Sequence, residues 1–278
     1  GRSSKSLMAG TNHPSGVITY FYLKDPGGKK VKISYLNSSN DTIQSFSTNS
    51  EKDKLEVSKG ANMHNWDMRG EGAEMLDGMI LWWASTDAPQ AVPGEYKVVL
   101  EIDDEELTES FKIIPDGNAE SDLAGMQKQY DFISSVNKTV DRAHKSIKKM
   151  RKVDAQLKDF QKQYKGNEEV TALIEKAEDL SEEISEIENA LYQTKNRSNQ
   201  DPLNFPIKLT NKLAHLNSLV GMDDFPPTTQ DIQVKDELTA AINSELEKFD
   251  ALLDNEIKEF NQEFNDLNLN YLFVEAED

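Results

Sequence analysis

Residues 94–140 read GEYKVVLEIDDEELTESFKIIPDGNAESDLAGMQKQYDFISSVNKTV, and the spacing of their apolar side chains changes once along the way. Up to Ile114, apolar and polar residues alternate, which is the two-residue period of a half-buried strand. After Asn118 the apolar residues recur every three or four positions, which is the period of an amphipathic helix. The sequence therefore predicts an α+β multidomain protein with strands before residues 115–118 and helices after them.

Residues 14–115 are predicted to form an Ig-like antiparallel β-sandwich, because short apolar or β-branched runs alternate with turn residues. The predicted strands are residues 17–23, 30–36, 42–48, 78–84, 96–102 and 106–114, the fourth of which reads GMILWWA. Pro26-Gly27-Gly28 and Asp103-Asp104 are expected to be tight hairpin turns. Across the Asp103 turn, Tyr96, Val98 and Leu100 are expected to lie opposite Leu107, Phe111 and Ile113.

Residues 121–270 are predicted to form an antiparallel four-helix bundle with long helices, after a linker at residues 116–120 and a tag or disordered lead at residues 1–13. The four apolar stripes span Leu123 to Tyr164, Leu173 to Leu191, Leu209 to Leu219 and Leu238 to Leu267. Gly166-Asn167 is expected to separate the first two helices. Thr228, with Asp231 three residues later, is expected to cap the last helix as a capping box.

Charge gives an expectation for how the first two helices pair. Six basic residues of the first helix, Arg142, Lys145, Lys148, Lys149, Arg151 and Lys152, would lie level with six acidic residues of the second, Glu175, Glu178, Asp179, Glu182, Glu183 and Glu186. Such surface pairs contribute about 0.2–1 kcal/mol each, so they would set register more than stability. The alternative is that the basic block binds an anionic ligand.

Composition limits the classes of partner. The 278 residues carry a formal net charge of −19 and no cysteine, so we expect neither nucleic-acid binding nor disulfides and thiolate chemistry. No apolar run reaches the roughly 20 residues that span a bilayer, and the first residues lack the apolar core of a signal peptide. We therefore expect no membrane span in this chain.

Motifs for catalysis or cofactor binding are not apparent. The histidines at 13, 64, 144 and 215 lack metal-site spacing, and neither a nucleophile elbow nor a dinucleotide loop is present. Asp103-Asp104-Glu105-Glu106 could hold calcium, but a solvated hairpin tip is the simpler interpretation. The sequence thus predicts no catalytic residues, no cofactor and no metal. Trp82 and Trp83 could stack on sugar rings, although strand alternation would place them on opposite faces.

Two segments resemble a known family. ANMHNWDMRGEGAE (61–74) and MILWWASTDAPQAVPGEYKVVLEIDDEELTESFKIIPD (79–116) resemble the Ig-like domain near the C-terminus of large secreted bacterial proteins. Those proteins begin with a β-propeller of the sortilin-like or BNR-repeat glycosyl-hydrolase type. LYQTKNRSNQDPLNFPIKLTNKLAHLNSLV (191–220) is similar to a segment between the helices of their tails. Gly70-Glu71 stands where the family more usually has an aromatic residue followed by proline.

The resemblance implies a non-catalytic interaction or scaffold module of a larger exported protein, extracellular, cell-surface or periplasmic. Its partner would be an upstream β-propeller or another protein, and any catalysis would belong to that propeller. It also implies that Trp66 enters a core, that Asp67 and Arg69 pair at a turn, and that Pro93-Gly94 makes a bend. The alternative is a carbohydrate-binding accessory module of a secreted glycoside hydrolase that uses the tryptophans.

Overall fold

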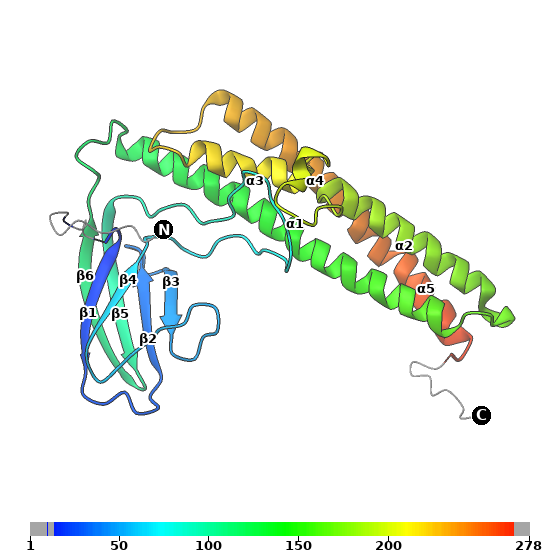
Figure 1. Ribbon diagram of the computed structural model, residues 1–278, viewed down its shortest axis with the longest axis horizontal. Helices are drawn as coiled ribbons and strands as arrows, with labels where there is room; N and C mark the ends of the chain where they lie inside the picture. Colours follow the sequence, from blue (N-terminus) through cyan, green and yellow to red (C-terminus); the bar gives the residue numbers. More distant parts are fainter. Residues whose placement is uncertain (1–9, 11–13, 270–278) are drawn as a thin grey trace, which may run out of the picture. The chain divides into compact units, whose positions relative to one another are not determined.

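The computed structural model of the chain describes residue 10 and residues 14–269, and it is an α+β protein (Figure 1). It divides into two compact units: a β unit, residues 1–71 and 88–123, and a helical unit, residues 72–87 and 124–278. Apart from Gly10, the predicted lead at residues 1–13, with His13, lies outside the described residues. So does residue 270, the predicted end of the bundle.

The β unit contains two antiparallel sheets. In one, β1 (Val17–Leu23) pairs with β4 (Gly60–Trp66). The other has the strand order β3-β2-β5-β6, formed by β3 (Thr42–Ser47), β2 (Val31–Leu36), β5 (Gly94–Ile102) and β6 (Glu105–Ile113). The predicted hairpin is confirmed, because Tyr96 lies opposite Phe111, Leu100 opposite Leu107, and Asp103 takes a φ of 53° in the turn.

Aromatic side chains join the two sheets of the β unit. The Trp66 ring on β4 stacks on the Tyr35 ring on β2, with centroids 4.4 Å apart and an interplanar angle of 16°. The Tyr35 hydroxyl lies 2.8 Å from Thr19 Oγ1 on β1. Burial raises the pKa of Tyr35, and the hydrogen bond with Thr19 opposes that rise. Because both rings are fully buried, the two sheets share one core.

The helical unit contains α1 (Leu123–Gln163), α2 (Thr171–Leu191), α3 (Leu209–Val220), α4 (Thr229–Asp254) and α5 (Glu256–Asp266), with short 3₁₀ turns η1 (Glu168–Val170) and η2 (Asp201–Leu203). The predicted stripes supply its core. Gly166 adopts a φ of 84° at the turn after α1, and the Thr228–Asp231 capping box is present. The predicted fourth helix is interrupted at Asn255, so it forms α4 and α5.

One predicted strand is wrong. Residues 78–84 form no strand, and the whole segment 72–87, here called the strap, belongs to the helical unit. Its apolar side chains Ala73, Leu76 and Met79 join the core of the helices. Their three-residue spacing fits an irregular chain lying on helices. A short apolar run can pack in a sheet or against helices, and its spacing does not distinguish the two. The sequence alone therefore predicted a strand.

The predicted charge pairing of the first two helices is also wrong for each ion pair that the structure gives to the basic block. Arg151 pairs with Glu188 of α2 at 2.8 Å, but Lys148 pairs with Glu74 of the strap and Lys145 with Asp141 of its own helix. The six predicted acidic residues are all exposed. The hydrophobic stripes set the rotation of the helices, and that rotation leaves these acidic side chains facing solvent.

Candidate functional site

The Trp66-Asp67-Arg69 motif is a structural element of the β unit. Trp66 Nε1 donates to the carbonyl oxygen of Arg69 at 2.7 Å, and the Asp67 carboxylate accepts the Arg69 N–H at 3.0 Å. The Arg69 guanidinium donates to the carbonyl oxygen of Ala88. Asp67 thus bonds the backbone of Arg69, and the guanidinium holds a different loop. The motif ties the end of β4 to the chain before β5.

The strap is held on the helices by side chains that bind its backbone. Asn211 Oδ1 accepts the N–H of Trp82 at 2.6 Å, and its Nδ2 donates to the Trp82 carbonyl oxygen at 2.9 Å. Asn217 Nδ2 donates to the carbonyl oxygen of Ser85 at 3.1 Å, and Asn137 Nδ2 donates to that of Asp87 at 2.7 Å. All three asparagines are buried, so the helices offer fixed polar groups where a neighbouring strand would otherwise be needed.

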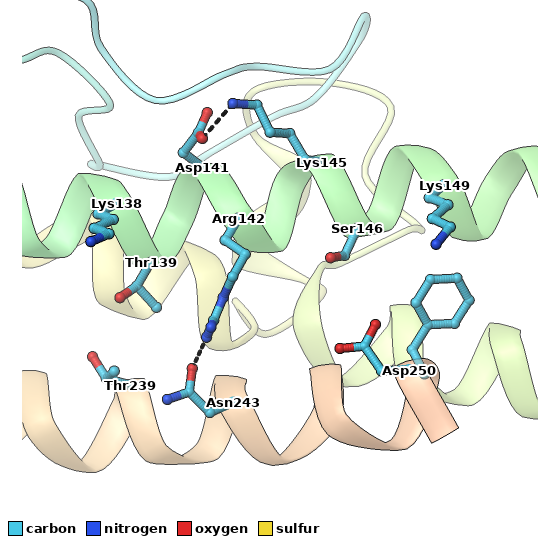
Figure 2. Close-up of a pocket in the computed structure, with 11 residues that line it drawn as sticks. Lys138, Thr139, Asp141, Arg142, Lys145, Ser146, Lys149, Thr239, Asn243 and Asp250 are labelled. Carbon is cyan, nitrogen blue, oxygen red and sulfur yellow. Dashed lines mark hydrogen bonds and ion pairs between the residues drawn. The ribbon is translucent and has the colours of Figure 1, made fainter. Parts of the chain in front are cut away.

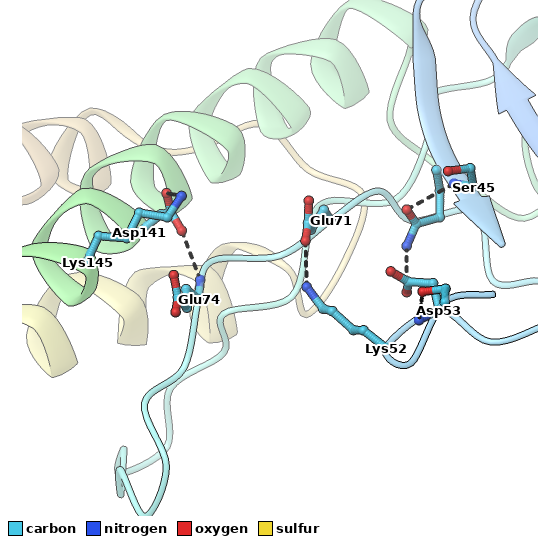
Figure 3. Close-up of polar contacts among 9 residues, drawn as sticks. Ser45, Lys52, Asp53, Glu71, Glu74, Asp141 and Lys145 are labelled. Atoms are coloured by element: carbon cyan, nitrogen blue, oxygen red, sulfur yellow. Dashed lines mark hydrogen bonds and ion pairs between the residues drawn. The ribbon is translucent and has the colours of Figure 1, made fainter. Parts of the chain in front are cut away.

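The other half of the strap is held by α1 and by the residue after α2. Figure 3 shows the N–H of Glu74 donating to Asp141 Oδ1 at 3.0 Å, with Lys145 beside that carboxylate. The carbonyl oxygen of Glu74 lies 2.5 Å from Nδ1 of His144, which is fully buried. Tyr192 accepts the N–H of Ile80 at 2.9 Å through its hydroxyl oxygen. The helical unit therefore recognises the strap at both ends and in the middle.

Electrostatics favour the same contacts. Burial lowers the pKa of His144, so its imidazole is neutral and its Nδ1–H can donate to the Glu74 carbonyl oxygen. Burial raises the pKa of Asp141, but the hydrogen bonds from Lys145 and from the Glu74 N–H bring it below its usual value. The Lys148 ammonium lowers the pKa of the Glu74 carboxyl through a hydrogen bond. Both carboxylates are therefore ionised at neutral pH.

The tryptophan pair lies on the strap, not on a sheet. Trp82 is half-buried and Trp83 is 71% exposed, and their ring centroids are 6.4 Å apart with an interplanar angle of 32°. The prediction that they point to opposite faces of a strand is wrong, because the chain there is irregular. Trp83 takes a φ of 51°, which is rare and unfavourable for a bulky side chain. His215 Nδ1 contacts its carbonyl oxygen, and Asn211 holds the residue before it.

The strap-binding residues were missed by the sequence analysis, although a signal exists. Asparagine is unfavourable inside helices, where its amide competes for backbone groups. Asn137, Asn211 and Asn217 nevertheless lie within helices, next to the apolar stripes. Buried asparagines at such positions indicate that the helix binds a polar backbone. Which segment supplies that backbone is a matter of tertiary structure.

The helical unit has a hollow of about 580 Å³ between α1 and α4 (Figure 2). Another, of about 430 Å³, is lined by residues 77–79 of the strap, by α1 and α2, and by the chain after α2, and it contains the Arg151–Glu188 ion pair. Within the described residues, no group of three or more His, Cys, Asp or Glu side chains could hold a metal ion. None of the described helices is both long and apolar enough to cross a membrane.

Comparison of the chain with protein-family models, with curated proteins and with solved structures gives no match. The resemblance to the propeller proteins therefore rests on the quoted motifs alone. Of the predicted site residues, Trp66, Asp67 and Arg69 lie together in the β unit, and Trp82 and Trp83 lie together on the strap. The strap pair is the candidate functional site, because it combines an exposed aromatic side chain with an unfavourable and firmly held backbone.

Proposed function

We propose that this chain is a non-catalytic interaction module of a larger exported protein, and that Trp83 is the centre of its docking surface. The observation that carries the proposal is the exposed indole on a backbone with a φ of 51°. A bulky residue in that conformation costs on the order of 1–3 kcal/mol and persists only where its surroundings enforce it. Asn211 and His215 supply that enforcement.

A tryptophan presented in this way suits protein recognition. Tryptophan is enriched among the residues that dominate binding energy at interfaces. A backbone that is already fixed loses little conformational entropy on binding, so more of the contact energy appears as affinity. If a partner encloses Trp83, Trp83→Ala should reduce the binding free energy of the complex by on the order of 2 kcal/mol or more, which is roughly a 30-fold weaker affinity.

We infer that the two sheets form an Ig-like sandwich, supported by their shared core around Trp66 and Tyr35. We also infer that α1 to α5 form a four-helix bundle in which α4 and α5 act as one broken helix. On the resemblance, the occupant of the Trp83 surface is a β-propeller, in the same chain or in another protein.

A second candidate is carbohydrate binding, favoured by the two indoles, whose ring centroids lie 6.4 Å apart. Sugar rings stack on exposed indoles in this manner, and a half-buried Trp82 would form the side of such a site. Protein docking and carbohydrate binding are tested with different ligands. Loss of glycan-array binding in Trp83→Ala, with folding intact, would favour the carbohydrate.

Site-specific crosslinking tests the leading proposal. A photo-reactive phenylalanine placed at position 83 in the full chain should give one discrete protein adduct in producing cells, identified by mass spectrometry as a β-propeller. The matched control places the same group at Tyr22 of β1, which is 70% exposed, and should not give that adduct. Adducts common to both positions would contradict the docking surface. Turnover of glycosides or peptides by the purified chain would contradict its non-catalytic role.

A further inference from the structure

A line of cations follows one face of α1. Lys138, Arg142, Lys145 and Lys149 are spaced by four, three and four residues, so they lie on one side of the helix and span about 16 Å along its axis. All four line the groove of about 580 Å³ between α1 and α4. Figure 2 shows Arg142 reaching Asn243 of α4, whereas Lys145 extends to Asp141 of its own helix. The groove is separate from the tryptophan pair, and the inference from it does not depend on the proposed function.

The opposite wall of the groove also carries polar side chains. α4 contributes Thr239, Asn243 and Asp250 together with the ring of Phe249, and α1 adds Thr139 and Ser146 between its cations. Apolar side chains of both helices form the core of the unit, as is usual for packed helices. The lining of the groove therefore offers hydrogen-bonding and charged groups together with apolar surface.

The cations of the groove are poorly neutralised by the protein. Lys145 pairs with Asp141, but Arg142 donates to the amide oxygen of Asn243, a neutral partner, and Lys149 lies 5.9 Å from the centre of the Phe249 ring. Within the described residues, no ion pair engages Lys138, Arg142 or Lys149. The carboxylates of Asp141 and Asp250 line the groove, and Asp254 lies near enough to Lys149 for the two charges to interact. Four cations still exceed these three carboxylates, and in a chain of net charge −19 this local excess of positive charge attracts an anion.

The remaining groups narrow the class of ligand. Hydroxyls and amides bind neutral polar groups, and the carboxylate of Asp250 accepts hydrogen bonds from hydroxyls. The Asp141 carboxylate is already bonded to the Glu74 N–H and to Lys145. A ligand with both hydroxyls and spaced anionic groups therefore suits the polar side chains and the cations that remain. We propose that the α1–α4 groove binds a short acidic oligosaccharide, with its uronate carboxylates or sulfate esters on Arg142 and Lys149 and its hydroxyls on Thr139, Ser146 and Asn243.

Calorimetric titration of the full chain tests this site. The probes are tetragalacturonate and a sulfated tetrasaccharide, which distinguish the two sources of negative charge, with maltotetraose as the uncharged sugar and tetraglutamate as the acidic peptide. We expect one acidic sugar or both to bind, with affinity falling as NaCl rises from about 50 to about 300 mM, because exposed charges are screened. Maltotetraose and tetraglutamate should bind at least tenfold more weakly.

Charge-matched variants place the binding in the groove. Arg142→Gln with Lys149→Gln should weaken binding of the acidic sugar at least tenfold. Lys152→Gln with Lys162→Gln removes the same charge from exposed positions of α1 outside the groove lining, and should change affinity less than twofold. Equal loss in the two double variants, no binding of either acidic sugar, or equal binding of tetraglutamate would overturn the proposal. Circular dichroism would verify that both variants keep their helices.

Discussion

The side-chain amide of Asn211 satisfies both polar groups of the Trp82 backbone, accepting its N–H at 2.6 Å and donating to its carbonyl oxygen at 2.9 Å. A neighbouring strand would offer the same two bonds, one donor and one acceptor. The amide therefore replaces a strand at the point where the strap lies on α3. Because a side-chain amide takes the place of strand pairing, an apolar segment with the sequence of a strand is stable on a helical surface.

Asn211→Ala should destabilise the helical unit by about 2–3 kcal/mol, because it leaves a backbone donor and an acceptor of the strap unpaired. Urea unfolding followed by circular dichroism at 222 nm would measure the loss. Asn261→Ala, at an exposed position of α5, is the matched control and should change stability by less than about 0.5 kcal/mol. A similar, small effect in the two variants would mean that the strap contributes little to the unit.

Trp83→Gly should make the protein more stable and less able to bind. Glycine adopts a φ of 51° without steric cost, so the change relieves strain and should raise the free energy of unfolding by up to about 1 kcal/mol. Little burial is lost, since the ring is mostly exposed. A stabilised variant that no longer binds the partner identified by crosslinking would match a surface kept for function at the expense of stability. A destabilised variant would mean that the indole serves packing.

Trp66 should behave in the opposite way. It is fully buried against Tyr35, so Trp66→Leu should cost the β unit about 3 kcal/mol or more through the cavity it leaves. Denaturant unfolding monitored by near-UV circular dichroism would report the lost packing of the aromatic core. A variant as stable as the native chain would exclude the shared core of the two sheets.

His144 should make the helical unit sensitive to acid. Burial lowers its pKa, so the unfolded chain binds more protons below the ordinary histidine pKa of about 6.5 than the folded chain does. The stability is therefore complete above about pH 6.5 and falls as pH drops toward the folded value, by at most about 1.4 kcal/mol per pH unit. Asp141 and Glu74 oppose this shift, but burial dominates.

A pH series checks that prediction. Urea midpoints of the 222 nm signal between pH 7.5 and 5.5 should fall in the native chain and fall less steeply in His144→Gln. An unchanged slope in His144→Gln would show that another group causes the acid sensitivity.

Much of the fold follows from local patterns. The period change after Pro115 predicts where the helices begin, and the Thr228–Asp231 cap and the Gly166 turn have local causes that the sequence displays. The Asp103 hairpin also has a local cause that the sequence displays. These features depend on residues close together in the chain, so composition and spacing suffice to predict them.

The strap and the groove could not be predicted in this way. GMILWWA has the composition of a strand. It is an irregular segment because side chains distant in the sequence, Asn211, Asn217 and Tyr192, bind the backbone of the strap. The basic face of α1 was visible, but its opposing helix was misassigned because hydrophobic packing, not surface charge, fixes helix rotation. Contacts between residues more than a hundred positions apart have no signature within a short window of sequence.

Hydrogen exchange of the full chain tests the strap most directly. In the native protein, the amide hydrogens of Glu74, Ile80 and Trp82 should exchange slowly, because each is bonded to a side chain of the helical unit. Asn211→Ala should speed exchange in residues 78–84 while leaving β5 and β6 protected. Rapid exchange across residues 74–85 in the native chain, or protection there that Asn211→Ala does not change, would contradict the role of Asn211 in holding the strap on the helices.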